Sequence, residues 1–258
     1  MPRNWDTPQW NFFQSVIQPQ YITSPATPAE AAQCKKVLED YGLFTACHSV
    51  LANVRRCPDS KENLIKQVEI AAELGSPLFH HTLIPEYNVD ISGYNEEIAR
   101  AVEVAVAVAN RAAELGITCI YEEQGAFVNG VEGFDGFYKL MKSACKNVGV
   151  CGDFGNILFV NEKPEDFLRA YGSQIRHIHV KDYLLKKAPA APGMYWAPAL
   201  DNHWLRDTII GDGIVNLDAC MQILREVGYQ GAFALENGHP EPFESGVKQA
   251  MNLLRQYW

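Results

Sequence analysis

The sequence has 258 residues, of which 47% are hydrophobic and 21% are charged, values typical of a globular protein and not of a disordered or fibrous one. Twenty-two basic residues against 31 acidic ones give a net charge of −9, which argues against a surface that neutralises phosphates. No apolar run approaches the ~20 residues of a membrane helix, and the amino terminus lacks the pattern of a secretory signal. We therefore expect a cytoplasmic protein that binds neither nucleic acid nor a membrane.

One pattern recurs along the chain: an amphipathic helix, a glycine that ends it, and a short apolar strand followed by a polar residue. The first example begins at Thr27-Pro28-Ala29-Glu30, which combines an N-cap threonine, a proline at the first helical position and a capping-box glutamate. This helix is expected to run to Tyr41 and to be followed by a strand over residues 43–47 that ends at His48.

Five more helix-to-strand units follow, and a terminal helix over about residues 245–257 closes the chain. The further strands are predicted at residues 78–79, 117–121, 148–152, 175–178 and 232–235. The polar residues that end them are His80 and His81, Glu122, Asp153, His179 and Glu236. Six such units in a row predict an α/β fold with an all-parallel sheet.

Two architectures use this repeat, the open doubly wound sheet and the closed (β/α)8 barrel. No Gly-x-Gly-x-x-Gly turn is present, which disfavours a dinucleotide-binding open sheet. Polar residues recur at the carboxyl ends of the strands, where a barrel keeps its active site. We therefore expect a TIM barrel, formed by residues 1–258 as a single domain.

The amino terminus limits this prediction. Six strands are visible, and only residues 1–27 remain to supply two more strands and a crossover helix, which need a longer segment. Residues 10–17 are expected to contribute one strand at most. The barrel is thus expected to be incomplete or irregular at its amino-terminal end.

Glu122, Asp153, His179 and Glu236 carry the chemistry that this arrangement predicts, because a barrel would bring their strand ends together. Three neighbouring carboxylates repel one another and resist ionisation unless a cation lies between them. Oxygen ligands with one imidazole suit Mn²⁺, Mg²⁺ or Co²⁺ better than a structural zinc site. The alternative is that each residue is a solvated polar group at the end of its strand.

Five short motifs follow one another over the chain from about Thr27 to the end. They are Glu122-Glu123-Gln124-Gly125, Asp153-Phe154-Gly155-Asn156, His177-Ile178-His179-Val180-Lys181-Asp182, Gly211-Asp212-Gly213, and Gly228-Tyr229-Gln230-Gly231 with Glu236. In order and spacing they resemble the motifs of the sugar isomerase/epimerase superfamily, whose members have a xylose-isomerase-like barrel.

The resemblance implies that Glu122, Asp153, His179 and Glu236 bind one divalent metal, usually Mn²⁺, with Mg²⁺, Co²⁺ and Zn²⁺ as alternatives. It also implies that Glu122 and Glu236 are catalytic and move a proton on or off the carbon beside a carbonyl. The expected activity is that of an isomerase or epimerase of a sugar, keto-sugar or polyol, acting through an enediolate that the metal stabilises.

Other activities remain open at this point. A lyase uses the same metal and base, either as an inosose-type dehydratase or as a C-glycoside-cleaving subunit. A barrel that binds a sugar or a partner subunit without turnover is a further alternative. An abasic-site endonuclease shares the barrel but needs three metals, and Asn156 stands where one of its additional ligands would lie.

Six residues are expected to contact the substrate. His48 and His81 follow early strands, and Asn156 follows the metal aspartate, at a position where relatives that act on free ketoses often carry histidine. Trp196, His203 and Arg206 lie in a long loop over residues 183–210, and aromatic rings suit the apolar faces of a sugar. The alternatives are buried, hydrogen-bonded histidines and a simple packed lid.

Three residues near the metal ligands are given supporting roles. His177 has the same parity as His179 on its strand and is expected to be a buried structural residue. Lys181 and Asp182 are expected either to hold the metal ligand in place or to form a plain ion pair. Finally, an open barrel edge would need cover, so we expect a homo-oligomer, with a dissimilar partner subunit as the alternative.

Overall fold

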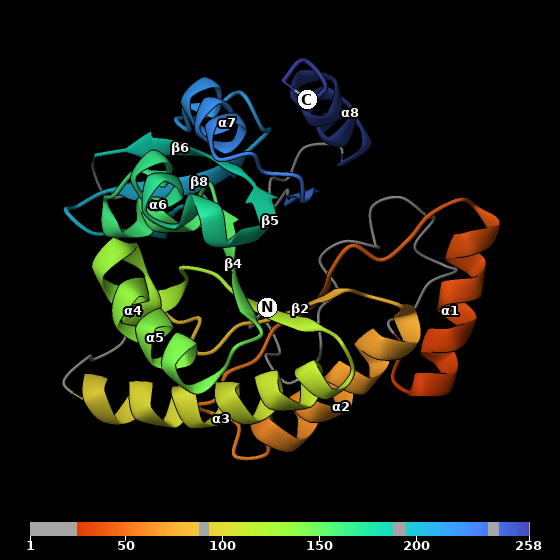
Figure 1. Cartoon of the computed structure of the whole chain (residues 1–258). Coiled ribbons are helices and arrows are strands. Elements are labelled where there is room, and N and C mark those ends of the chain that lie inside the picture. Colours follow the sequence, from red (N-terminus) through yellow and green to blue (C-terminus); the bar gives the residue numbers. More distant parts are fainter. Residues whose placement is uncertain (1–24, 88–92, 188–194, 237–242, 258) are drawn as a thin grey trace. The chain divides into compact units, whose positions relative to one another are not determined.

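The computed structural model describes residues 25–87, 93–187, 195–236 and 243–257 (Figure 1). These residues form two compact units. The first comprises the described residues up to Val128 together with residues 133–149, and the second comprises residues 129–132 and those from Val150 onward. The single domain expected from the sequence stays a prediction.

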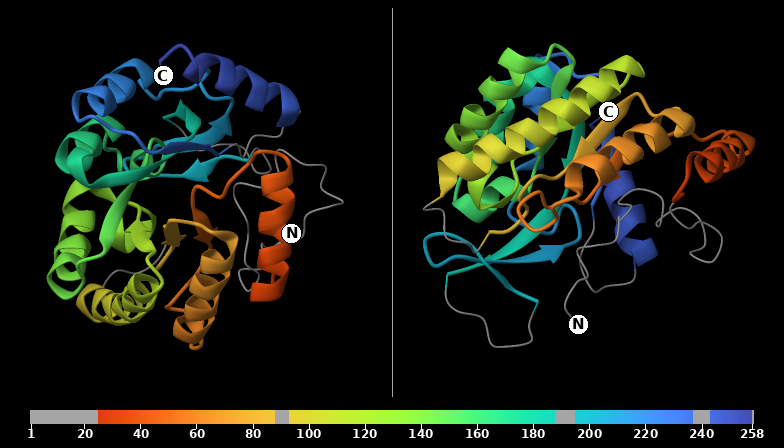
Figure 2. Two further views of the ribbon diagram at one scale, coloured as in Figure 1. Left: turned by 45° about the vertical axis from the view of Figure 1, so that its right-hand side comes forward. Right: turned by 90° about the horizontal axis from the view of Figure 1, so that it is seen from below.

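The first unit is built from helices and short parallel strands in alternation. The helices are α1 (Pro28–Asp40), α2 (Ser60–Leu74), α3 (Tyr94–Glu114), α4 (Gly125–Val128) and most of α5 (Gly130–Ala144). The strands are β1 (His48–Val50), β2 (Leu78–His81) and β3 (Thr118–Tyr121), and each pairs in parallel with the next. Helices α1, α2 and α3 lie side by side in that order (Figures 1 and 2).

The helix boundaries follow the local signals in the sequence. The Thr27 hydroxyl accepts a hydrogen bond from the Glu30 N–H at 3.3 Å, and the Glu30 carboxylate accepts one from the Ala26 N–H at 2.7 Å, which forms a cap at the start of α1. Gly75, with φ 72°, ends α2 in the left-handed conformation. The repeated helix and strand pattern is therefore confirmed in this unit.

The first strand differs from its prediction. Residues 43–47 were expected to form it, but the strand is His48–Val50 and pairs from His48 opposite Phe79. Leu43 is 38% exposed and Phe44 is 77% exposed, so this apolar run is not part of the sheet. His48 consequently begins a strand instead of following one, and the prediction for residues 43–47 was wrong.

The two faces of β1, β2 and β3 have different partners. The register places Ser49 opposite His80 and His80 opposite Ile120, so these side chains share one face. On the other face, His48 Nε2 lies 3.0 Å from the side-chain oxygen of Gln67 in α2. The Tyr121 hydroxyl, also on that face, donates to a backbone carbonyl of α3 at 3.2 Å.

The second unit repeats the arrangement around three more strands. β4 (Val148–Asp153) passes from the first unit into the second, and it pairs in parallel with β5 (Ile175–Val180), which pairs with β9 (Ala232–Leu235). The α-helices of this part are α6 (Pro164–Tyr171), α7 (Leu217–Glu226) and α8 (Phe243–Leu254). Two short 3-10 helices, η1 (Asn156–Val160) and η2 (Gly172–Gln174), connect the strands to α6.

A small second sheet replaces much of the loop that was predicted over residues 183–210. β6 (Asp182–Lys186), β8 (Trp204–Thr208) and β7 (Ala197–Pro198) form three antiparallel strands in the order β6-β8-β7 (Figure 2). Leu185 pairs with Leu205, which is buried, and this apolar pairing accounts for a sheet in a segment rich in turn residues. The prediction of an irregular loop was wrong.

Two further expectations concern the remainder of the chain. The strand expected at residues 10–17 lies outside the described residues. Among the residues that the structure describes, no helix has the length and apolar character needed to cross a membrane.

His48 and His81 predict how the stability of the fold depends on pH. Burial lowers the pKa of each from 6.5 to about 4, so both rings are neutral when folded and take up a proton near pH 6.5 when unfolded. The contribution of each histidine to the free energy of unfolding is thus fully present above pH ~6.5. It is lost as the pH is lowered towards ~4, by up to ~3 kcal/mol for each histidine. Urea unfolding of the wild type across this range should show the loss. The variant His48→Gln should have a shallower slope, and a slope equal to that of the wild type would contradict the assignment.

Candidate functional site

Strand register brings three of the four predicted metal ligands together in the second unit. Asp153 ends β4 and lies directly opposite His179 in β5. His179 in turn lies opposite Ala234, and Glu236 comes two residues later, so its side chain points to the same face. The Glu236 N–H continues the ladder with a 2.9 Å hydrogen bond to the Val180 carbonyl.

The three side chains face one another closely. His179 Nδ1 lies 3.6 Å from Asp153 Oδ2 and 3.3 Å from Glu236 Oε1. One ligand atom from each residue can be chosen so that all three lie within 4.8 Å of one another. Asp153 and His179 are buried, and the Glu236 side chain is 19% exposed, so the group is open to solvent only at Glu236.

Lys181 belongs to the same group, two residues after His179. Its ammonium lies 2.8 Å from Asp153 Oδ2 and 2.6 Å from Glu236 Oε2, and its side chain is only 8% exposed. It also donates to Asn156 Oδ1 at 3.3 Å. Lys181 therefore binds both carboxylates of the group at once.

The positive charge decides the ionisation of the two carboxylates. Burial by itself would raise the pKa of Asp153, but Lys181 and His179 outweigh burial and hold that pKa below its ordinary value. The pKa of Glu236 is lowered for the same reasons, burial opposing the shift and Lys181 and His179 producing it. Both groups are therefore ionised at neutral pH.

The donor set fits a divalent cation. Asp153 Oδ1 accepts hydrogen bonds from the backbone N–H groups of Gly155 at 2.7 Å and Asn156 at 2.8 Å, which turns Oδ2 towards His179. Glu236 directs Oε2 to Lys181 and Oε1 to His179. Two carboxylate oxygens and one imidazole nitrogen thus face one another, a combination suited to Mn²⁺ and similar ions.

Asp182, the last residue of its motif, supports the backbone next to this group. Its buried carboxylate accepts hydrogen bonds from the backbone N–H of the next residue, Tyr183 (2.9 Å), and from three N–H groups of the segment after β8, at Gly211 (3.0 Å), Gly213 (2.9 Å) and Val215 (3.0 Å). It is Asp153 and Glu236 that pair with Lys181, and Asp182 orders the Gly-x-Gly turn.

Two motif glycines are required by close approach. A β-carbon on Gly213 would overlap the Asp182 carboxylate, and a β-carbon on Gly155 would overlap the side chains of Lys181 and Tyr183. The glycines therefore make room for Lys181 and Asp182, the two residues that follow Val180 in the chain.

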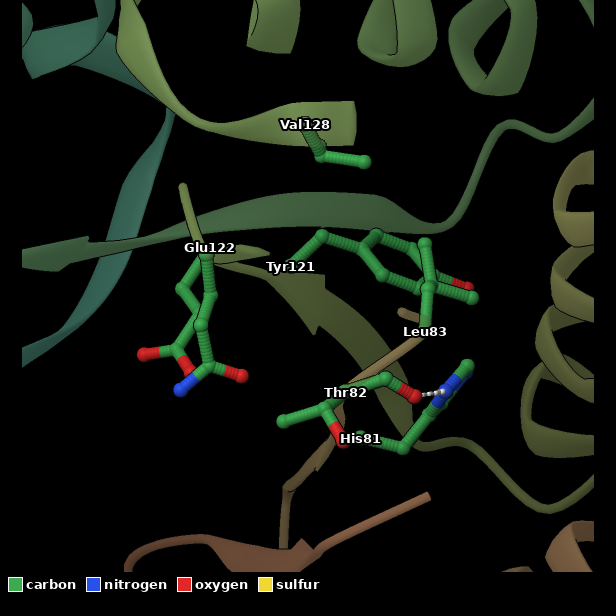
Figure 3. A pocket seen from close by; sticks show the side chains of 7 residues that line it. His81, Thr82, Leu83, Tyr121, Glu122 and Val128 are labelled. Atoms are coloured by element: carbon green, nitrogen blue, oxygen red, sulfur yellow. Dashed lines mark hydrogen bonds between the residues drawn. The ribbon is translucent and has the colours of Figure 1, made fainter. Parts of the chain in front are cut away.

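Glu122, the fourth predicted ligand, lies in the first unit directly after β3. Its side chain is 4% exposed, and its Oε1 lies 3.5 Å from His80 Nε2. Figure 3 shows Glu122 pointing away from the rings of Tyr121 and His81. Successive residues of a strand point to opposite faces, so Glu122 shares the face of Ile120 and His80.

The two predicted substrate histidines lie on the face that packs against helices. His48 contacts Gln67 of α2, and the His81 ring meets the Tyr121 ring edge to face at 5.2 Å. His81 Nδ1 lies 3.1 Å from the Thr82 carbonyl, and His81 and Glu122 both line a cavity of about 10 Å³ (Figure 3), room for roughly one water molecule. Substrate contact by these histidines stays a prediction.

His80 was not selected from the sequence, although it occupies the face that carries Glu122. Two adjacent histidines at a strand end point to opposite faces, and the pairing with β1 and β3 decides which of them shares a face with Glu122. The available signal was the alternation of side chains along β2, which puts His80 on the face of Leu78 and His81 on the opposite face.

The other predicted contacts lie in the second unit. Asn156 joins the Lys181 group, as described above. The guanidinium of Arg206, in β8, lies over the ring of Trp196, just before β7, 5.3 Å from its centre. The backbone N–H of His203 donates to the Leu200 carbonyl at 3.2 Å. Substrate contact by Asn156, Trp196, His203 and Arg206 stays a prediction. His177 is buried, and its ring meets the His179 ring edge to face at 5.4 Å. Its structural role stays a prediction.

Comparisons with known proteins identify the family and the fold of the chain. Residues 11–257 match the model of a family described as xylose isomerase-like TIM barrel. An inosose dehydratase of Bacillus thuringiensis (strain Al Hakam) is 23% identical over 251 residues, which are 89% of this chain and 82% of that protein.

Solved structures with a similar fold include a D-allulose 3-epimerase from Methylomonas sp. in complex with D-allulose, with a TM-score of 0.69, 16% identity and coverage of 90% of this chain and 83% of the other. The IOLI protein with a bound zinc atom has a TM-score of 0.66 and 16% identity, over 93% of this chain and 84% of that one.

Removal of the Lys181 charge tests the electrostatics of the group. In metal-free protein, Lys181→Met should lower the free energy of unfolding by ~3–5 kcal/mol, because it leaves two buried carboxylates without their cation. Urea unfolding in the presence of EDTA measures this. The control is Lys186→Met, at an exposed lysine in β6, which should cost little. Equal stability of the two variants would contradict the assignment.

Proposed function

Because the chain belongs to the xylose isomerase-like TIM barrel family, we propose that it is a divalent-metal-dependent isomerase or epimerase of a sugar, keto-sugar or polyol. Family membership confirms the fold class and the resemblance drawn from the motifs. Members of the family include enzymes, which supports an enzyme here, and the reaction itself is the proposal.

The observation that carries the proposal is the meeting of Asp153, His179 and Glu236, with one ligand atom from each lying within 4.8 Å of the others. The expected ion is Mn²⁺, with Mg²⁺, Co²⁺ and Zn²⁺ as alternatives. We assign Glu122 as the fourth ligand, because it lies at the carboxyl end of its strand as the other ligands do, and the carboxyl ends of the strands form the active-site face of a TIM barrel.

In this proposal the two glutamates move the proton. A bound divalent ion supplies a Lewis acid that polarises the carbonyl of the substrate. Glu236 is suited to remove the proton from the neighbouring carbon, because Lys181 keeps its carboxylate ionised and its side chain is the one in the group that solvent reaches. Glu122 supplies the second acid or base. Its burial keeps bulk water away from the carboxylate.

A lyase is the second candidate, and the relationship to inosose dehydratases favours it. The proton would be removed in the same way, and the resulting enediolate would expel a hydroxyl from the next carbon instead of being reprotonated. Glu236 and Glu122 would keep their roles, with one of them protonating the leaving oxygen. The proposed homo-oligomer, with a dissimilar partner subunit as the alternative, is compatible with either reaction.

Hydrogen exchange with solvent tests the proposal. Wild-type protein with Mn²⁺, incubated in D₂O with a panel of ketoses and keto-inositols, should introduce deuterium beside the carbonyl of at least one compound, as followed by proton NMR. Glu236→Gln should abolish the exchange because the amide accepts no proton at neutral pH. The matched control Glu226→Gln, at an exposed glutamate of α7, should exchange like the wild type.

The same spectra separate the two candidates. An epimerase or isomerase gives the proton signals of an isomer of the substrate, whereas a dehydratase, which eliminates water, gives new vinylic or enol signals. Absence of exchange and of product with every compound in the metal-loaded protein would contradict both, and would favour a barrel that binds without turnover.

A further inference from the structure

Ser49, His80 and Glu122 form a line across the three parallel strands of the first unit. The register sets Ser49 of β1 opposite His80 of β2 and His80 opposite Ile120 of β3, and Glu122 lies two residues beyond Ile120 on the same face. The Ser49 hydroxyl lies 2.7 Å from His80 Nδ1, and His80 Nε2 lies 3.5 Å from Glu122 Oε1. The His80 ring thus stands between the hydroxyl and the carboxylate.

The chemistry of the three groups fixes where the hydrogens are. A carboxylate only accepts hydrogen bonds, so the nitrogen that faces it, Nε2, is the one that carries the hydrogen. In the neutral ring Nδ1 is then an acceptor, and the Ser49 hydroxyl donates to it over 2.7 Å. The carboxylate therefore favours the tautomer of His80 that presents an N–H to it, and the Ser49 hydroxyl, which can donate to Nδ1 of that tautomer, holds the ring in place.

Burial makes this contact consequential. The side chains of His80 and Glu122 are 2% and 4% exposed, so water has little access to either. The distance of 3.5 Å is longer than a short hydrogen bond and is that of an electrostatic contact. A polarised N–H beside a buried carboxylate biases the carboxylate towards one orientation.

We propose that His80 is a positioning residue that orients the carboxylate of Glu122 for the metal, and that the hydrogen bond from Ser49 holds the His80 ring in place. This inference rests on the proposed function, in which Glu122 is a ligand. Groups that hydrogen-bond to metal ligands fix ligand orientation, and their loss typically lowers metal affinity by about 10- to 100-fold. His48 and His81 are the neighbours with which His80 contrasts, because they lie on the opposite face, where His48 contacts Gln67 of α2 and His81 contacts the Thr82 carbonyl.

Two substitutions of His80 separate positioning from packing. The amide nitrogen of glutamine reaches about as far as Nε2, so His80→Gln keeps a donor towards Glu122, whereas the shorter asparagine reaches about as far as Nδ1 and keeps only the side facing Ser49. The probe is Mn²⁺ alone, and its dissociation constant is measured by calorimetry at one pH for the wild type, both variants, Ser49→Ala and Glu122→Gln. Urea unfolding in EDTA reports on the fold of each.

The expected result is a dissociation constant for His80→Asn about 10- to 100-fold above that of the wild type, with His80→Gln within about threefold of it. Ser49→Ala should lie between them, and both His80 variants should have similar urea midpoints. Wild-type affinity in His80→Asn, or an equal loss in both His80 variants, would overturn the positioning role and leave the proposed function standing. Wild-type affinity in Glu122→Gln would also overturn it. Absence of Mn²⁺ binding by the wild type would overturn the proposed function together with this inference.

Discussion

Like charges placed side by side in a buried region must be balanced, and this constraint dominates the second unit. Asp153 and Glu236 both reach the Lys181 ammonium, at 2.8 and 2.6 Å, and both approach His179 Nδ1. Without positive charge, burial and mutual repulsion would favour protonated carboxyls, which are poor bases and poor ligands. The lysine therefore keeps the two groups ionised and in place, and it does so from within the chain.

Much of the surrounding sequence serves this arrangement. Gly155 leaves room for the Lys181 side chain to lie between the carboxylates, and the N–H groups that follow Asp153 orient its carboxylate. Asp182 holds the turn at Gly213, where no side chain would fit. The motifs that look independent along the chain are thus connected in space, and a change in one of these residues would be felt by the charged group.

The sequence was sufficient for features that depend on local rules. Asp153, His179 and Glu236 each lie at the carboxyl end of an apolar strand, so their meeting at one edge could be predicted from the repeat alone. Features that depend on pairing could not. Register decides which of His80 and His81 shares a face with Glu122. Pairing with β2 also decides where the first strand lies: it begins at His48, after the apolar run at residues 43–47. The small sheet containing β6 and β8 was missed because its strands are separated by about 17 residues of turn-rich sequence.

We propose that Asp153, His179 and Glu236 bind one divalent ion, with Glu122 as the proposed fourth ligand. Crystals grown with Mn²⁺ and measured on both sides of the manganese absorption edge test it most directly, because the anomalous signal locates the ion and the map identifies its ligands. We expect one strong peak, with Asp153 Oδ2, His179 Nδ1 and carboxylate oxygens of Glu236 and Glu122 in contact with it. A peak at other residues, or none at a saturating Mn²⁺ concentration with Lys181 still between the carboxylates, would contradict the account.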